Sequence, residues 1–88
     1  MASYKVIFKP SVEKDLRSLP KSALDRVLKR IEALKQDPFP PQATKLTGTW
    51  ATHRVRVGDY RVIYGVDKQK NQIIIHHVRH RREVYKHL

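Results

Sequence analysis

The sequence predicts an α+β fold in which two N-terminal helices pack on one face of an antiparallel sheet. Apolar residues recur at helical spacing between residues 20 and 37. After residue 51 the pattern changes to short segments rich in valine, isoleucine and tyrosine, which is typical of strands. Gly58 and Asp59 stand between two such segments and form a two-residue hairpin signal. The expected order of elements is therefore β-α-α-β-β-β, followed by a short C-terminal helix.

The first part of the chain predicts a strand followed by a helix. Tyr4 to Phe8 form a short run of residues that favour strands. Pro10 suits the first position of a helix, because its missing N–H would have no partner there. We expect this helix to run as far as Leu19 and to stop before Pro20.

A second helix is expected from Pro20 to Asp37. It carries one apolar stripe, which consists of Leu24, Val27, Leu28, Ile31 and Leu34. Because a residue before proline is pushed out of the helical region, Asp37-Pro38 ends this helix. A stiff proline-rich connector at residues 38–41 follows, and then a loop from Thr44 to Gly48.

The C-terminal part predicts three strands, at Thr52–Val57, Tyr60–Val66 and Gln72–Arg79. A polar turn at residues 67–71 separates the last two strands, and a short helix over residues 82–86 closes the chain. The sequence contains no internal repeat and no low-complexity tract. We therefore expect residues 1–88 to form a single domain.

The composition favours a polyanionic partner. The chain has 19 Lys+Arg against 8 Asp+Glu, a formal net charge of +11 at pH 7. Such a charge attracts nucleic acid, the commonest polyanion inside a cell, although a basic surface also simply keeps a small protein soluble. A membrane fits less well, because no segment combines a basic face with a broad aromatic and leucine face. With no cysteine and no signal-peptide pattern, we expect a cytoplasmic protein that folds without disulfides and binds no membrane.

The hairpin predicts a cluster of arginines. With Gly58-Asp59 as its loop, Arg56 faces Arg61, and strand alternation puts Arg54 on the same side. Like charges directly across a strand pair cost stability, so selection for folding alone would more often place Glu or Thr opposite Arg56. Either this is a solvated face with splayed arginines, or it is an anion cradle. Guanidinium groups suit phosphate because they stay charged and present a planar fork of donors.

A second cluster follows the third strand and has the sequence HHVRHRREVY at residues 76–85. His76 and His80 would lie on one side of an extended strand, as metal ligands can. The positive groups around them oppose a dication, so we expect no metal and no cofactor. Histidine as a proton carrier near neutral pH is chemically more useful here. Tyr85 fits either a packed amphipathic tail or an aromatic platform for a base.

Taken together, these segments resemble the RelE/ParE superfamily of toxins from bacterial and archaeal toxin–antitoxin pairs. The likeness covers nearly the whole chain. Its most specific parts are RVRVGDYRVIY at residues 54–64 and HRREVY at residues 80–85. In this superfamily the RelE branch cuts messenger RNA in the ribosomal A site, whereas the ParE branch poisons DNA gyrase without cutting RNA. The resemblance implies a RelE-like fold and a ribosome-dependent, metal-independent endoribonuclease that inhibits translation.

The resemblance also implies roles for particular residues. The matching positions are Arg54, Arg56, Arg61, Arg81 and Tyr85. Arg61 would hold the scissile phosphate, and Arg81 would act on the side of the leaving group. The two arginines of the first hairpin strand would fix the RNA backbone, and Tyr85 would stack on or orient a nucleotide. We expect Lys45, Arg79 and Arg82 to bind RNA phosphate as well.

The general base is not supplied by the resemblance, because RelE has lysines where this chain has Arg54 and Arg56, and arginine hardly deprotonates. From its place in the sequence, His80 is the first candidate, and His77 or His53 is the reserve. Two alternatives stay open, a ParE-like gyrase inhibitor and a non-catalytic RNA-binding module. The implied partners are a cognate antitoxin, the ribosome and messenger RNA.

Overall fold

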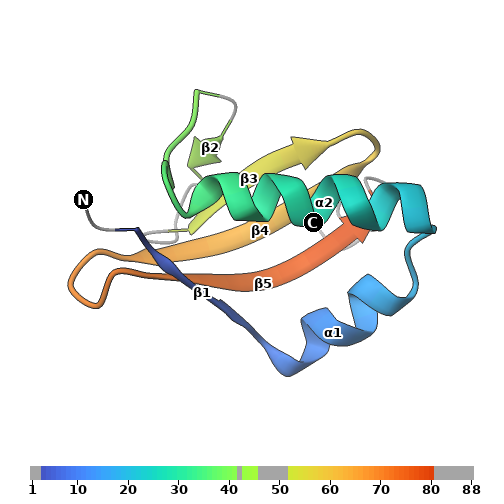
Figure 1. Ribbon diagram of the computed structural model, residues 1–88, viewed down its shortest axis with the longest axis horizontal. Coiled ribbons are helices and arrows are strands. Elements are labelled where there is room, and N and C mark those ends of the chain that lie inside the picture. The colour runs from blue at the N-terminus through green and yellow to red at the C-terminus, as the bar shows by residue number, and fades with distance from the viewer. Residues whose placement is uncertain (1–2, 42, 46–51, 81–88) are drawn as a thin grey trace.

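The structure is a computed structural model that describes residues 3–41, 43–45 and 52–80. Two helices pack on a five-stranded sheet with the strand order β1-β5-β4-β3-β2 (Figure 1). The elements are β1 (Lys5–Phe8), α1 (Pro10–Arg17), α2 (Lys21–Leu34), β2 (Thr44–Lys45), β3 (Thr52–Val57), β4 (Tyr60–Asp67) and β5 (Gln72–His80). The predicted α+β class is confirmed. The expected helix over residues 82–86 lies outside the described residues.

The sheet is mixed, whereas the sequence suggested an antiparallel one. β1 pairs with β5 in parallel, with Val6 opposite Ile73, while β4 is antiparallel to both of its neighbours. β1 is linked to the sheet only through the helices, so no tight turn sets its direction. The expected loop after the proline-rich connector also contains a two-residue edge strand, β2, in which Lys45 pairs with His53 of β3.

The helices begin where the prolines predict and end slightly earlier than expected. Pro10 is the first residue of α1, and Pro20 directly precedes α2. After α1 ends at Arg17, the Ser18 hydroxyl donates a hydrogen bond of 2.7 Å to the main-chain oxygen of Asp15. Neither helix in the described ranges is both long and apolar enough to cross a membrane.

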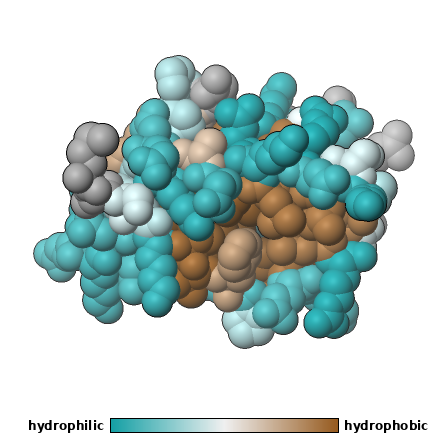
Figure 2. All heavy atoms as spheres, in the orientation of Figure 1, coloured by the Kyte–Doolittle hydropathy of each residue, from teal (hydrophilic) through white to brown (hydrophobic). Residues whose placement is uncertain are grey.

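The core lies between the helices and the sheet. It consists of Val12, Val27, Ile31 and Leu34 from the helices, and Val55, Val57, Val62, Tyr64, Val66, Ile73, Ile75 and Val78 from the strands. Three residues of the predicted stripe on α2 are thus buried, whereas Leu28 is 39% exposed. Figure 2 shows an apolar surface between the two helices, surrounded by hydrophilic side chains. Leu16 and Leu19 of the first helical segment are partly buried and pack against the core.

A bulge interrupts the pairing of β4 with β5. Tyr64 lies opposite Ile75, but the preceding residue, Ile63, lies opposite His77. One extra residue, His76, is therefore inserted in β5. Such an insertion reverses the alternation of side chains along the strand, because strand residues point in turn to opposite faces of the sheet.

The bulge decides which side of the sheet the end of β5 presents. Ile73 and Ile75 are fully buried in the core. Regular alternation would therefore turn His77 and Arg79 toward the core as well. Because of the extra residue, Val78 is the one that packs in the core, at 2% exposed. His77 and Arg79 consequently lie on the face turned away from the core.

Candidate nucleic-acid interface

Three arginines lie in register across the three central strands of the sheet. Arg56 of β3 pairs with Arg61 of β4, as the hairpin signal predicted. Arg61 pairs in turn with Arg79 of β5, which the hairpin alone could not indicate. Residues directly opposite one another in an antiparallel sheet project to the same side. The three guanidinium groups therefore share the face away from the core, which we call the arginine face.

A second row lies next to the first one on the arginine face. Ile63 of β4 has Arg54 on one side and His77 on the other. Arg54 is two residues from Arg56, and His77 is two residues from Arg79, so alternation puts both rows on one face. The cluster predicted from the hairpin thus extends over three strands and includes one imidazole.

Exposure differs along the arginine row. Arg56 is exposed and Arg79 is partly exposed, while Arg61 on the central strand is only 3% exposed. Burial restricts the Arg61 side chain to few positions, which suits a group that contacts one particular phosphate.

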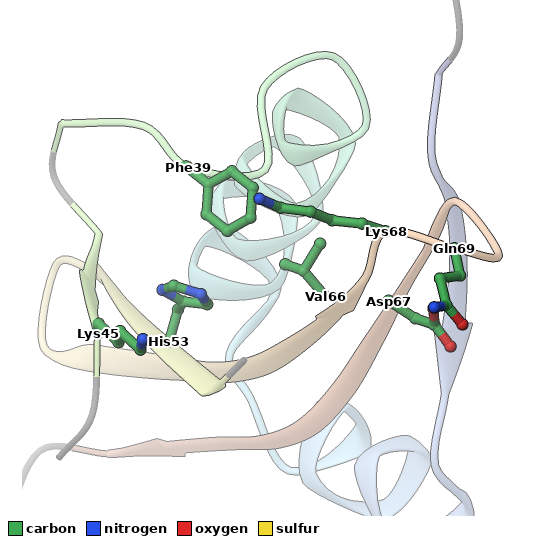
Figure 3. A pocket seen from close by; sticks show the side chains of 7 residues that line it. All are labelled: Phe39, Lys45, His53, Val66, Asp67, Lys68 and Gln69. Atoms are coloured by element: carbon green, nitrogen blue, oxygen red, sulfur yellow. The ribbon is translucent and has the colours of Figure 1, made fainter. Parts of the chain in front are cut away.

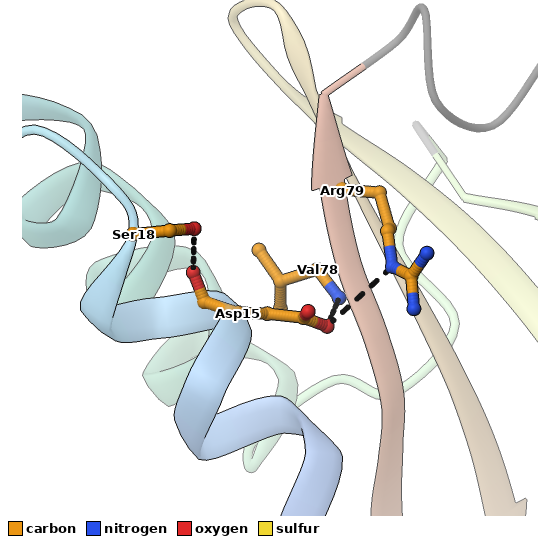
Figure 4. A network of polar contacts seen from close by, with 4 residues as sticks. All are labelled: Asp15, Ser18, Val78 and Arg79. Carbon is orange, nitrogen blue, oxygen red and sulfur yellow. Dashed lines mark hydrogen bonds and ion pairs between the residues drawn. The ribbon is translucent and has the colours of Figure 1, made fainter.

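A carboxylate of α1 anchors the β5 end of the row (Figure 4). Asp15 Oδ2 accepts a hydrogen bond of 3.2 Å from the main-chain N–H of Val78. The same oxygen lies 3.7 Å from Arg79 Nε, and the Asp15 side chain is 17% exposed. Asp15 therefore covers the free edge of β5 beyond its pairing with β1. It also offsets part of the positive charge that the three arginines bring together.

His77 is exposed, and its surroundings nevertheless favour the neutral form of its imidazole. Burial lowers its pKa below the ordinary value of 6.5, and so do the charges of Arg79 and Lys9, while Asp15 acts in the opposite direction. Burial also lowers the pKa of His76, as do Lys9 and His77. A neutral imidazole at pH 7 can accept a proton, which an arginine cannot.

His80 does not share the arginine face, contrary to the sequence-based expectation. It pairs with Tyr60, and the two rings meet edge to face with centroids 5.5 Å apart. Tyr60 packs against the core, so both residues lie on the helix side of the sheet. The bulge is the reason, because it turns the odd-numbered residues 77 and 79 toward the arginines.

The other expected site residues are divided between the two faces or lie outside the structure. Lys45 pairs with His53, which is 9% exposed and belongs to the helix side, so this lysine is separated from the arginine face. Arg81, Arg82 and Tyr85 lie outside the described residues. Within the described ranges no three histidine or acidic side chains gather in a way that could hold a metal ion.

Comparison with known proteins gives the family. A family model described as the ParE toxin of the type II toxin–antitoxin system parDE matches residues 6–85. RelE1 of Methanocaldococcus jannaschii is 38% identical over 78 residues, which cover 85% of this chain and 87% of that protein. Toxin RelG of Mycobacterium tuberculosis is 30% identical over 87 residues, which cover 94% of this chain and 97% of that toxin.

A solved structure agrees with these relatives. One chain of the archaeal RelE–RelB complex from Pyrococcus horikoshii matches with a TM-score of 0.81 and 37% identity. The match covers 90% of this chain and 96% of the archaeal one. The resemblance drawn from the hairpin and the tail is thereby confirmed at the level of the family. The chain belongs to the RelE/ParE superfamily of toxins from type II toxin–antitoxin systems.

Proposed function

We propose that this toxin cleaves messenger RNA in the ribosomal A site by attack of the substrate's 2′-hydroxyl on the adjacent phosphate. The observation that carries the proposal is the row of Arg56, Arg61 and Arg79 in register across three strands. Guanidinium groups stay charged and present a planar fork of donors, which suits a phosphate. A phosphate diester carries a negative charge that grows in the transition state of this reaction, so a row of fixed cations favours that state.

The protein must accept the proton of the 2′-hydroxyl, stabilise the charge of the phosphorane and help to protonate the leaving 5′-oxygen. The 2′-oxygen loses its proton and bonds to phosphorus, a pentacovalent phosphorane forms, and the 5′-oxygen leaves with a proton. The products are a 2′,3′-cyclic phosphate and a free 5′-hydroxyl. We assign stabilisation of the phosphorane to Arg61, since it is central in the row, and grip of the flanking backbone to Arg54, Arg56 and Arg79. No step of this scheme requires a metal ion.

We assign the general base to His77. It shares the arginine face with Arg61 and stands one row away from it, and its lowered pKa favours the neutral, proton-accepting form. His80 was the first candidate from sequence, but it lies on the helix side with Tyr60. By resemblance, Arg81 serves the leaving group and Tyr85 orients a nucleotide. The charge of Arg82 favours one more phosphate contact.

The proposed partner that restrains the toxin is a cognate antitoxin. The related archaeal RelE was crystallised with RelB. The formal net charge of +11 favours an acidic partner, and the apolar surface between the helices in Figure 2 favours an amphipathic segment.

The test is single-turnover cleavage on ribosomes programmed with a defined message. Arg61→Ala should lower the rate about 10²-fold or more, because it removes a contact to the transition state. His77→Gln should cause a comparable loss, whereas His80→Gln should retain most of the rate. Lys29→Ala, on the exposed side of α2, is the matched control for loss of one positive charge. Unchanged cleavage by Arg61→Ala would refute the proposed site. If His80→Gln were inactive while His77→Gln remained active, the assignment of His77 as the general base would be refuted.

A ParE-like gyrase inhibitor is the second candidate, because the matching family model is described for ParE. It predicts inhibition of DNA supercoiling by purified gyrase while messages stay intact. That outcome would contradict the nuclease proposal. If the protein bound ribosomes but neither cleaved messages nor inhibited gyrase, it would be a non-catalytic RNA-binding module.

A further inference from the structure

A pocket of about 560 Å³ lies on the helix side of the sheet, on the opposite face from the arginines (Figure 3). It is lined by Phe39, Lys45, His53, Val66, Asp67, Lys68 and Gln69. Its volume falls in the range of about 300–1,000 Å³ that is usual for ligand pockets. The pocket is formed where β4 ends, far along the strand from the hairpin turn, and the proposed cleavage mechanism does not use it.

An aromatic ring is held partly in solvent at this pocket. Phe39 is 41% exposed, although a phenyl ring gains by burial. Its main-chain N–H donates to Asp37 Oδ1 at 3.1 Å, and the carbonyl of the preceding Pro38 accepts a hydrogen bond of 2.8 Å from the buried Tyr64 hydroxyl. Pro40 restricts the backbone on the other side. The ring is therefore a preorganised surface, and little conformational entropy is lost when a flat ligand packs on it.

The neighbouring ring is the imidazole of His53, whose surroundings favour its neutral form. His53 meets Phe39 edge to face with centroids 5.0 Å apart and stacks on Tyr64 at 5.6 Å. Burial lowers the pKa of His53, and the charge of Lys45 lowers it further. Together with Val66, these rings give the pocket an apolar lining that accepts a planar group.

Cations flank the apolar lining. Lys68 Nζ lies 5.2 Å from the centroid of the Phe39 ring, and Lys45 lies beside His53 at another side of the pocket (Figure 3). Asp67 and Gln69 supply a carboxylate and an amide at the far end. A purely apolar ligand would leave these polar groups without a role, and a cationic one would meet two lysines. The lining fits a ligand that combines a planar ring, a hydrogen-bonding edge and an anionic group.

We propose that this pocket binds an unpaired nucleotide of RNA, with its base against Phe39 and its phosphate at Lys45 and Lys68. The inference rests on the proposed function for the identity of the RNA, which would be the message or the ribosomal RNA around it. Arg54 and His53 are consecutive residues of β3 and point to opposite faces, next to the two-residue edge strand β2. The pocket and the arginine face therefore lie on the two sides of the same strand.

The test is titration of the full-length, isotope-labelled chain with 5′-AMP, followed by nuclear magnetic resonance. We expect saturable shifts at Phe39, His53 and Lys68. Phe39→Leu, which keeps an apolar side chain without the ring, should weaken binding about fivefold or more, since stacking on an aromatic ring contributes about 1–3 kcal/mol per base. Lys68→Gln should weaken it too and changes only an exposed side chain. Lys29→Gln, which removes a charge elsewhere, should leave the affinity unchanged.

Three outcomes would overturn the inference. The first is that 5′-AMP causes no saturable shift at the pocket. The second is that inorganic phosphate alone binds as tightly as 5′-AMP, and the third is that Phe39→Leu binds as well as the unmodified chain. Binding of 5′-AMP needs no cleavage, so this measurement is independent of the ribosome assay. On ribosomes, Phe39→Leu should raise KM more than it lowers kcat, whereas Arg61→Ala should lower kcat.

Discussion

Replacement of Asp15 tests how α1 holds the arginine row. In Asp15→Ala the main-chain N–H of Val78 loses its acceptor at 3.2 Å, and Arg79 loses a carboxylate at 3.7 Å. A largely buried donor left without a partner costs about 1–3 kcal/mol. The ion pair is longer than a hydrogen bond and partly exposed, so it adds at most about 1 kcal/mol. We expect a loss of about 2 kcal/mol in the free energy of unfolding.

Urea and thermal unfolding followed by circular dichroism measure this loss. For a domain of this size, about 2 kcal/mol corresponds to a fall in Tm of about 8–16 °C. Asp15→Asn keeps an oxygen acceptor for Val78 and should lose less than Asp15→Ala. Glu13→Gln, an exposed position on the same helix, is the matched control and should stay within about 0.5 kcal/mol. If Asp15→Ala were as stable as this control, the carboxylate would not anchor β5 and the reasoning would fail.

Three further predictions concern stability. The pKa of His53 is lowered in the folded chain, so the unfolded chain binds more protons below about pH 6.5. The contribution of His53 to stability should be complete above that pH and fall as the pH drops, by up to about 1.4 kcal/mol per pH unit. His53→Gln should make the fall in urea unfolding less steep, and His76 and His77 should account for what remains of it. Tyr64→Phe removes the buried hydroxyl bond to the carbonyl of Pro38 and should cost about 1–2 kcal/mol; no loss would mean that this bond does not hold the connector. Gly58→Ala should cost about 1–2 kcal/mol in the same assay, because Gly58 has a φ of +59° and an added Cβ would approach Arg26 at 3.1 Å.

Local signals in the sequence account for much of this fold. Prolines at positions 10 and 20 mark where the helices begin, because the ring restricts φ and removes a donor that the first turn does not need. The two-residue turn at Gly58-Asp59 fixes the register of β3 on β4, and with it the pairing of Arg56 with Arg61. In both cases the constraint on the backbone acts over a few consecutive residues, so it can be predicted from the sequence of that short segment.

Contacts between distant segments were less predictable. The parallel pairing of β1 with β5 and the edge strand β2 depend on how the helices and the connector return the chain to the sheet. The face of His80 depends on the bulge, which follows from packing of the isoleucines on the core rather than from local propensity. In the structure the break is plain, since Ile73, Ile75 and Val78 are all buried and cannot share a face in a regular strand. The sequence alone does not show that break, because Ile74 and Val78 would share a face in a regular strand.

The bulge itself predicts that one histidine of the pair at positions 76 and 77 is dispensable. Deletion of either one yields the same chain, in which Ile75 and Val78 are separated by a single residue. Regular alternation then keeps both in the core and turns the remaining histidine and Arg79 to the arginine face. We expect a stability within about 1 kcal/mol of the unmodified protein in urea, and cleavage on ribosomes that is largely retained. His77→Gln, by contrast, keeps the bulge but removes the imidazole from this face, so it should be folded and nearly inactive. If the deletion failed to fold, or if it folded but was as inactive as His77→Gln, then alternation around the bulge would not be what brings histidine and arginine together.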